Sequence, residues 1–191
     1  NVEYAQIKRG NLHNPNHPNV CGVGYYGIGK YNYTNNQKIY TSWQNMIKRC
    51  YDEKIQEKQA SYKDVIVCEE WKCFQNFAEW YEDNYNYETM QGWHLDKDIL
   101  VKGNKIYSPE TCCFVPIEIN LLLNKNKTIR GDYPIGVSFD KKRFVAQINK
   151  RDNKKRNHIG VFDTPEEAFQ AYKVPKESRI KEVAEEYKEQ I

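Results

Sequence analysis

The sequence predicts an α+β protein with N-terminal helices, a β-hairpin followed by a helix, and a three-stranded antiparallel sheet packed on a C-terminal helix. Apolar residues recur at three- and four-residue spacing in two segments before residue 85. Short β-branched runs separated by turn residues follow residue 93. A capping sequence then precedes an amphipathic segment. The 191 residues are enough for two domains of ordinary size.

Two amphipathic helices are predicted in the first half of the chain. Helical spacing of apolar residues runs from Tyr40 to Cys50 and again from Phe74 to Asn84. The β-branched run Val65–Val67 between them predicts a short strand. We interpret the aromatic side chains of both helices as core residues rather than as a stacking platform for nucleic-acid bases.

The middle of the chain predicts a hairpin and a helix. Two apolar runs, Trp93–Val101 and Ile106–Tyr107, flank a Gly-Asn turn. Pro116–Leu123 follows as a helix with proline in its first turn. The polar, basic segment 124–130 predicts the boundary between two domains, which span residues 1–125 and 131–191.

The C-terminal domain has the clearest local signals. Thr164 is a predicted N-cap, with Pro165 at the first helical position and Glu167 completing a capping box. Pro175 is expected to end or kink this helix, with a charged second helix from Lys176. The predicted strands are Ile135–Phe139, Arg143–Asn149 and Asn157–Phe162.

Positive charge is concentrated in one part of this domain. The formal net charge is only +3, but residues 141–158 contain eight basic residues and one acidic residue. Residues 163–190 contain eight acidic and five basic residues. A basic β-rich segment followed by an acidic helix predicts two different faces, one of them suited to a polyanion. The alternative is a solvated, lysine-rich surface.

Composition excludes several classes of function. No stretch approaches the ~20 consecutive apolar residues of a membrane span, and the N-terminus lacks a signal pattern, so we expect a soluble protein without a membrane partner. The cysteines are scattered through a chain that otherwise looks intracellular, so we interpret them as reduced thiols. A structural Zn²⁺ site is the competing interpretation, which their spacing disfavours, and no Cys/His dyad has supporting spacing. They are Cys21, Cys50, Cys68, Cys73, Cys112 and Cys113.

Four C-terminal segments resemble the Apetala2/ethylene-response-factor (ERF) domain, which also occurs in phage and mobile-element nucleases. They are Ile135–Val137, Arg143–Ile148, Ile159–Thr164 and Glu166–Tyr172. In that family the sheet lies in the major groove of double-stranded DNA and the helix supports it from behind. The resemblance implies DNA-facing positions at Ile135, Ser138, Asp140, Gln147, Asn149, Arg156 and His158.

The residue types at these positions differ from those of the plant domains, which place several Arg and Trp there. Only Arg156 has the residue type found in the plant domains, and this scarcity of arginine disfavours GC-rich specificity. Gln147 and Asn149 are suited to adenine. The cations expected to hold phosphates are Lys141, Lys142, Arg143, Lys150, Lys154 and Lys155.

A second set of residues resembles the HNH (ββα-metal) nuclease motif of phage homing-type endonucleases. It comprises Asp96-x-Asp98, Gly103-Asn104, Tyr107–Glu110 and Asn120. The resemblance implies a divalent cation held by Asp98 or Asp96 together with Asn120. Oxygen ligands suit Mg²⁺ or Mn²⁺. His94 is the nearest candidate general base, giving the catalytic set His94, Asp96 and Asp98, but it stands outside the register of the motif.

Together these features predict a phage-type DNA-binding protein, an HNH-like endonuclease that docks on duplex DNA and cleaves it with a divalent metal. The bacterial host cytoplasm is its expected location. The alternative is a catalytically inactive DNA-binding regulator, or a phage counter-defence protein that binds a nucleic-acid-targeting defence protein of the host. In that alternative the Asp-x-Asp sequence belongs to a degenerate nuclease fold.

Overall fold

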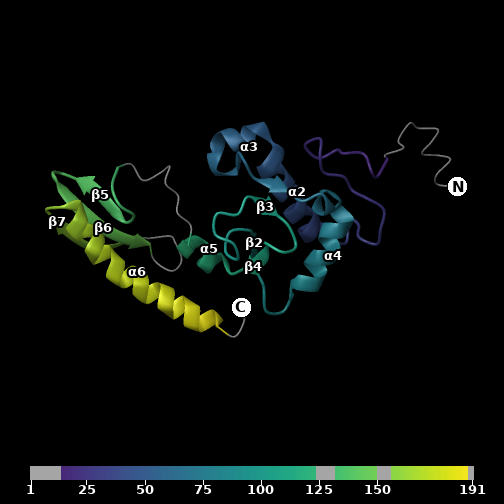
Figure 1. Cartoon of the computed structure of the whole chain (residues 1–191). Coiled ribbons are helices and arrows are strands. Elements are labelled where there is room, and N and C mark those ends of the chain that lie inside the picture. Colours follow the sequence, from purple (N-terminus) through teal and green to yellow (C-terminus); the bar gives the residue numbers. More distant parts are fainter. Residues whose placement is uncertain (1–13, 124–131, 150–155, 189–191) are drawn as a thin grey trace. The chain divides into compact units, whose positions relative to one another are not determined.

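The computed structural model describes residues 14–123, 132–149 and 156–188. The chain divides into two compact units, Asn1–Val115 and Pro116–Ile191 (Figure 1). The division falls before the predicted linker at 124–130. That linker lies outside the described residues. The mixed α+β class expected from the sequence is confirmed in the elements of both units.

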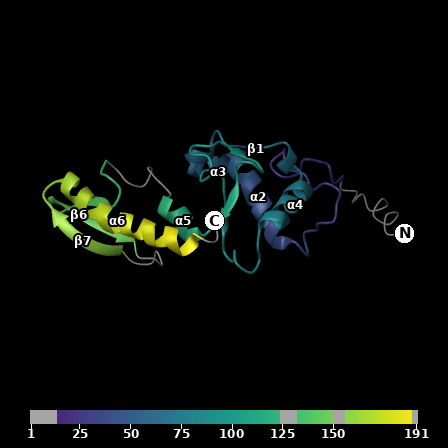
Figure 2. The ribbon, with the colours of Figure 1, turned by 60° about the horizontal axis from the view of Figure 1, so that its bottom comes forward.

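The first unit is built around α2 (Gln37–Tyr51) and α4 (Phe74–Asn84), which pack side by side (Figure 2). Both predicted helices are confirmed. Their aromatic side chains form the core, and Trp43, Trp71 and Phe77 have no exposed surface. The remaining helical turns of this unit are α3 (Glu53–Lys58), η1 (Ala60–Tyr62) and η2 (Glu70–Lys72).

The predicted hairpin between residues 93–101 and 106–107 is wrong. Strand β2 (His94–Asp96) pairs antiparallel with β4 (Cys113–Val115), whereas β3 (Ile106–Tyr107) pairs in parallel with β1 (Ile66–Val67). The Gly-Asn turn therefore does not join two paired strands.

Side-chain hydrogen bonds explain why β2 ends so early. The Asp96 carboxylate accepts from the backbone N–H groups of Asp98 and Ile99 at 2.7 and 2.9 Å, which turns the chain. The buried Lys97 ammonium then donates to the Asn104 carbonyl at 2.9 Å, and the Asn104 amide donates to the Lys97 carbonyl at 2.9 Å. These bonds satisfy backbone groups that a hairpin would have used.

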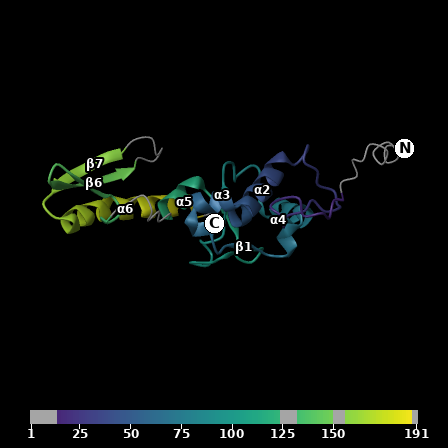
Figure 3. The same ribbon diagram turned by 90° about the horizontal axis from the view of Figure 1, so that it is seen from above.

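The second unit contains a three-stranded antiparallel sheet with strand order β5–β6–β7, as predicted. Its strands are β5 (Val137–Asp140), β6 (Arg143–Asn149) and β7 (Arg156–Phe162). One face of the sheet packs on α6 (Pro165–Tyr187), so that sheet and helix form two layers (Figure 3).

The core of this unit lies between the two layers. Val137 and Ala146 from the sheet meet Ala168 and Tyr172 from α6. Gly136 has a φ of +80°, and a β-carbon there would lie less than 3.0 Å from three ring atoms of Tyr172. Glycine is therefore required at this position, both for its backbone conformation and for the close approach of the tyrosine ring.

Helix α6 begins as predicted but does not end at Pro175. Thr164 caps it by accepting from the Glu167 N–H at 3.2 Å, and Pro165 stands in the first turn. The expected end of the helix at Pro175, with a second helix from Lys176, is wrong, because the helix continues to Tyr187. Contacts with α5 (Ile117–Leu123) accompany this second half of α6.

The contacts between α5 and α6 are polar and largely shielded from water. The Arg179 guanidinium lies 2.6 Å from the Glu118 carboxylate, and both side chains are less than one-fifth exposed. The Lys176 ammonium donates to the Leu122 carbonyl at 3.1 Å. These contacts give the residues after Pro175 a packing partner, which offsets the backbone hydrogen bond that proline cannot make.

Candidate nucleic-acid interface

The sheet of the second unit has one covered face and one outer face. Because side chains alternate along a strand and directly opposite residues share a face, the strand register assigns each side chain to one of the two. Ala146 lies in the core with α6, so its neighbours Val145 and Gln147 face the other way. The described outer-face residues are Ser138, Asp140, Arg143, Val145, Gln147, His158 and Val161.

The predicted DNA-facing residues are thus divided by the structure. Ser138, Asp140, Gln147 and His158 share the outer face. Ile135 does not, because it packs against the core between the sheet and α6, and its assignment as a DNA-facing residue is wrong.

The other predicted DNA contacts are described only in part. Asn149 pairs with Arg156 two residues beyond the Gln147–His158 pair, and only the backbone of these two residues is described. The predicted phosphate ligands Lys150, Lys154 and Lys155 lie outside the described residues.

A β-bulge changes which side chains of β7 face outward. Gln147 is opposite His158, and Ala146 is opposite Gly160, so β7 has one extra residue at Ile159. Ile159 and Phe162 both pack against the core, although strict alternation would place them on opposite faces. Val161 consequently lies on the outer face, where 44% of it is exposed.

Two predicted phosphate ligands occupy the tight turn between β5 and β6. Lys141 and Lys142 have φ values of +45° and +75°, and the flanking Asp140 and Arg143 are paired. Positive φ at both central positions is the pattern of a type I′ turn, which favours Asn-Gly. Lysine at both positions costs backbone free energy, and such strain is often kept where side chains have a role. Both lysines are exposed.

Arg143 is the only arginine among the described outer-face side chains, and it already has a partner. Its guanidinium lies 2.8 Å from the Asp163 carboxylate, just beyond the end of β7. Asp140 is its cross-strand neighbour on the same face. This end of the face therefore combines two turn lysines with a neutralised arginine.

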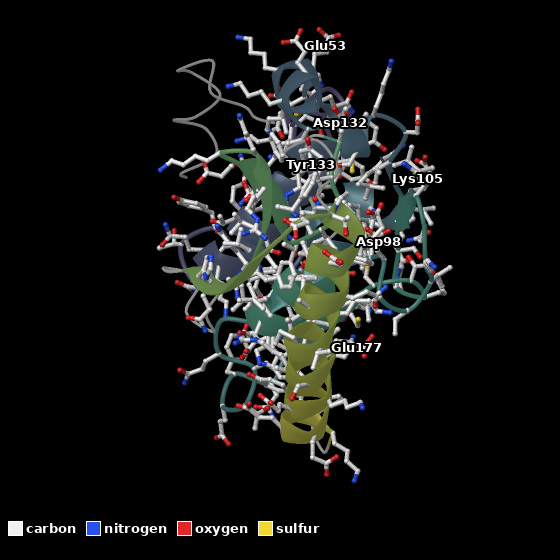
Figure 4. All side chains as sticks on the ribbon, turned by 90° about the vertical axis from the view of Figure 1, so that its left-hand side faces the viewer. Glu53, Asp98, Lys105, Asp132, Tyr133 and Glu177 are labelled. Atoms are coloured by element: carbon white, nitrogen blue, oxygen red, sulfur yellow. The ribbon has the colours of Figure 1, made fainter. Side chains whose placement is uncertain are left out.

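The residues of the predicted metal site form a different local structure. Both carboxylate oxygens of Asp98 accept from the Lys97 ammonium at 2.8 Å (Asp98 is labelled in Figure 4). One oxygen of Asp96 is used in the turn that ends β2. His94 is exposed at the start of β2. Asn120 lies on α5 in the second unit, so the predicted ligands are divided between the two units.

Two buried cysteine side chains are not activated as nucleophiles. Burial raises the pKa of Cys112 to about 12, and it raises the pKa of Cys50 to about 12 as well. Such thiols are protonated at neutral pH, whereas the nucleophile and the zinc ligand are thiolates. Within residues 14–123, 132–149 and 156–188 no group of three His, Cys, Asp or Glu side chains could hold a metal ion.

Sequence reasoning missed three residues that shape these sites. Lys97, which is 6% exposed, has no predicted role as the middle residue of Asp-x-Asp. A lysine between two aspartates is nevertheless itself a signal of an ion pair. Asp163, the partner of Arg143, likewise has no predicted role in the interface. Val161 is not among the predicted DNA-facing residues, and no sequence signal marks the bulge at Ile159 that turns it outward.

No protein-family model, curated protein or solved structure matches the chain. None of the described helices is both long enough and apolar enough to span a bilayer.

Proposed function

We propose that this protein binds double-stranded DNA through the outer face of the β5–β6–β7 sheet. The observation that carries the proposal is the strand register, which gathers Ser138, Gln147 and His158 on the face opposite α6. These side chains donate and accept hydrogen bonds of the kind that base edges use. The exposed Lys141 and Lys142 border the same face and suit phosphates.

The two turn lysines allow a test in which loss of binding and loss of folding are separated. Lys141→Asn/Lys142→Gly installs the sequence that a type I′ turn prefers, so it should keep or raise stability. It also removes two phosphate ligands. Each phosphate contact contributes about −0.9 to the slope of log K against log salt, so the slope should fall in magnitude by about two.

The measurement is fluorescence anisotropy of a labelled duplex across a salt series. Lys181→Asn/Lys188→Asn is the matched control, because it removes the same charge from two exposed positions away from the sheet's outer face, one on α6 and one directly after its last residue. The control should keep the wild-type slope. An unchanged slope in the turn variant would exclude this face, and no salt-sensitive binding by the wild type would favour a host protein as the partner.

Metal-dependent cleavage of the bound DNA is the second candidate function. What supports it is the chain order around Asp96, in which the antiparallel pair β2–β4 is followed directly by α5 with Asn120. The ββα-metal module that the sequence resembles has the same strand–strand–helix order along the chain, although the strand that follows Asp98 here, β3, pairs with β1. Mg²⁺ or Mn²⁺ would have to displace the Lys97 ammonium from Asp98.

Nicking of supercoiled plasmid with Mn²⁺ tests this second candidate. Cleavage that Asp98→Asn and Asn120→Ala abolish, with duplex binding retained, would support it. A wild-type protein that binds DNA but cuts none with either metal would exclude cleavage and leave DNA binding as the proposed function.

A further inference from the structure

The outer face of the sheet differs from a guanine-reading surface in the chemistry of its described side chains. Arginine is the residue that most often reads guanine, through two hydrogen bonds to the base. Arg143 is paired with Asp163 at 2.8 Å, and Asp140 lies opposite it. The exposed carboxylates of Asp140 and Asp163 also repel the acceptor atoms of guanine at this end of the face.

Small apolar side chains cross the face next to this ion pair. Val145 lies on the central strand between Ser138 on β5 and Val161 on β7. Val145 is 8% exposed, whereas Val161 is 44% exposed. The bulge at Ile159 is what turns Val161 to this face, and bulges commonly re-aim a side chain beside a functional site.

The next row of the face carries hydrogen-bonding groups. Gln147 stands opposite His158, two residues along from the Val145–Val161 pair on β6. Glutamine matches the N6 donor and N7 acceptor of adenine, and aliphatic groups match the C5-methyl group of thymine. Two residues along a strand span about 6.6 Å, close to two base-pair steps of about 3.4 Å each.

We infer that the outer face selects A·T base pairs in the major groove, with Val161 contacting a thymine methyl group and Gln147 reading an adenine about two steps away. This inference rests on the proposed DNA binding. It specifies which duplexes are preferred and which two side chains carry the preference.

The test begins with selection of bound duplexes from a randomised pool at fixed salt. The selected site is then synthesised in three forms: as selected, with its A·T pairs exchanged for G·C, and with thymine replaced by uracil, which lacks only the methyl group. The G·C form should bind at least about fivefold more weakly, from the usual discrimination by one bidentate contact. Loss of the methyl group should weaken binding about fourfold.

Two variants assign the preference to the named side chains. Val161→Ala should bind the thymine and uracil duplexes equally, and Gln147→Ala should lose the preference for adenine. Val174→Ala and Gln170→Ala on α6 are the matched controls, because both residues are exposed on the helix that covers the other face. The controls should keep both ratios.

The outcomes separate this inference from the proposed function. Salt-sensitive duplex binding with G·C-rich selected sites, or with no base preference, overturns A·T selection and leaves DNA binding intact. A thymine-to-uracil ratio that survives Val161→Ala overturns the role of Val161. No duplex binding at any salt concentration overturns both proposals.

Discussion

Gly136→Ala should destabilise the second unit more than an ordinary glycine substitution, because two separate costs meet at this position. At a φ of +80° an alanine costs about 1–2 kcal/mol relative to glycine. The new β-carbon would also lie less than 3.0 Å from the Tyr172 ring. That ring is 6% exposed in the core, so relief of the overlap should cost a further ~1–3 kcal/mol.

Gly92→Ala is the matched control, since it has the strain without the overlap. Its φ is +76°, and nothing lies within 4 Å of the position of an added β-carbon. We therefore expect a loss of about 1–2 kcal/mol from Gly92→Ala and about 2–5 kcal/mol from Gly136→Ala. The difference between the two substitutions measures the contact between Gly136 and Tyr172.

The distribution of tryptophan allows the two units to be followed separately. All four tryptophans precede residue 94 and so lie in the first unit. Denaturation followed by tryptophan fluorescence reports on that unit, and far-ultraviolet circular dichroism reports on both. Gly136→Ala should shift only the transition seen by circular dichroism. Equal losses of stability from the two substitutions would refute the argument that the tyrosine ring requires glycine.

Three further predictions concern charged and ionisable groups. Arg179→Met should cost up to about 3 kcal/mol because it removes the largely buried 2.6 Å ion pair with Glu118. Glu177→Gln, in the exposed pair with Lys173, should cost at most ~0.5 kcal/mol (Glu177 is labelled in Figure 4). Urea denaturation compares the two losses of stability. Lys97→Met should cost about 1–3 kcal/mol in the tryptophan-fluorescence transition, since the Asn104 carbonyl loses its donor, and an unchanged midpoint would contradict this. The pKa of Cys112 is raised by burial to about 12, so the folded state keeps a proton that the unfolded state loses, and stability should fall as pH rises from about 9 towards 12. Cys112→Ala should flatten that decline.

Helices and local turns were predictable from the sequence because their determinants are close together in the chain. The three- and four-residue spacing gave α2 and α4, and Thr164 with Glu167 gave the start of α6. The strands of the C-terminal sheet were predictable for the same reason, since each is adjacent in sequence to its partner.

Pairings between distant segments were not predictable in this way. Strand β3 pairs with β1, which lies 40 residues earlier, and its two residues resemble the second strand of a hairpin equally well. The continuation of α6 past Pro175 likewise accompanies its contacts with α5, including Arg179 with Glu118. The outward position of Val161 depends on one extra residue in β7, and the period-two pattern of the sequence assigns it to the wrong face.

The ion pairs show why local charge in the sequence is an incomplete guide to a binding surface. Lys97 and Arg179 are cations that the fold itself uses, because each is largely buried and pairs with a carboxylate. Arg143 lies within the basic segment yet faces Asp163 on the outer surface. Among the described residues Lys141 and Lys142 make no salt bridge, and their positive φ values hold them at the tip of the hairpin. A ligand phosphate would meet these two lysines without first displacing a carboxylate. They are therefore the described cations from which a salt-dependent contribution to DNA binding is expected first.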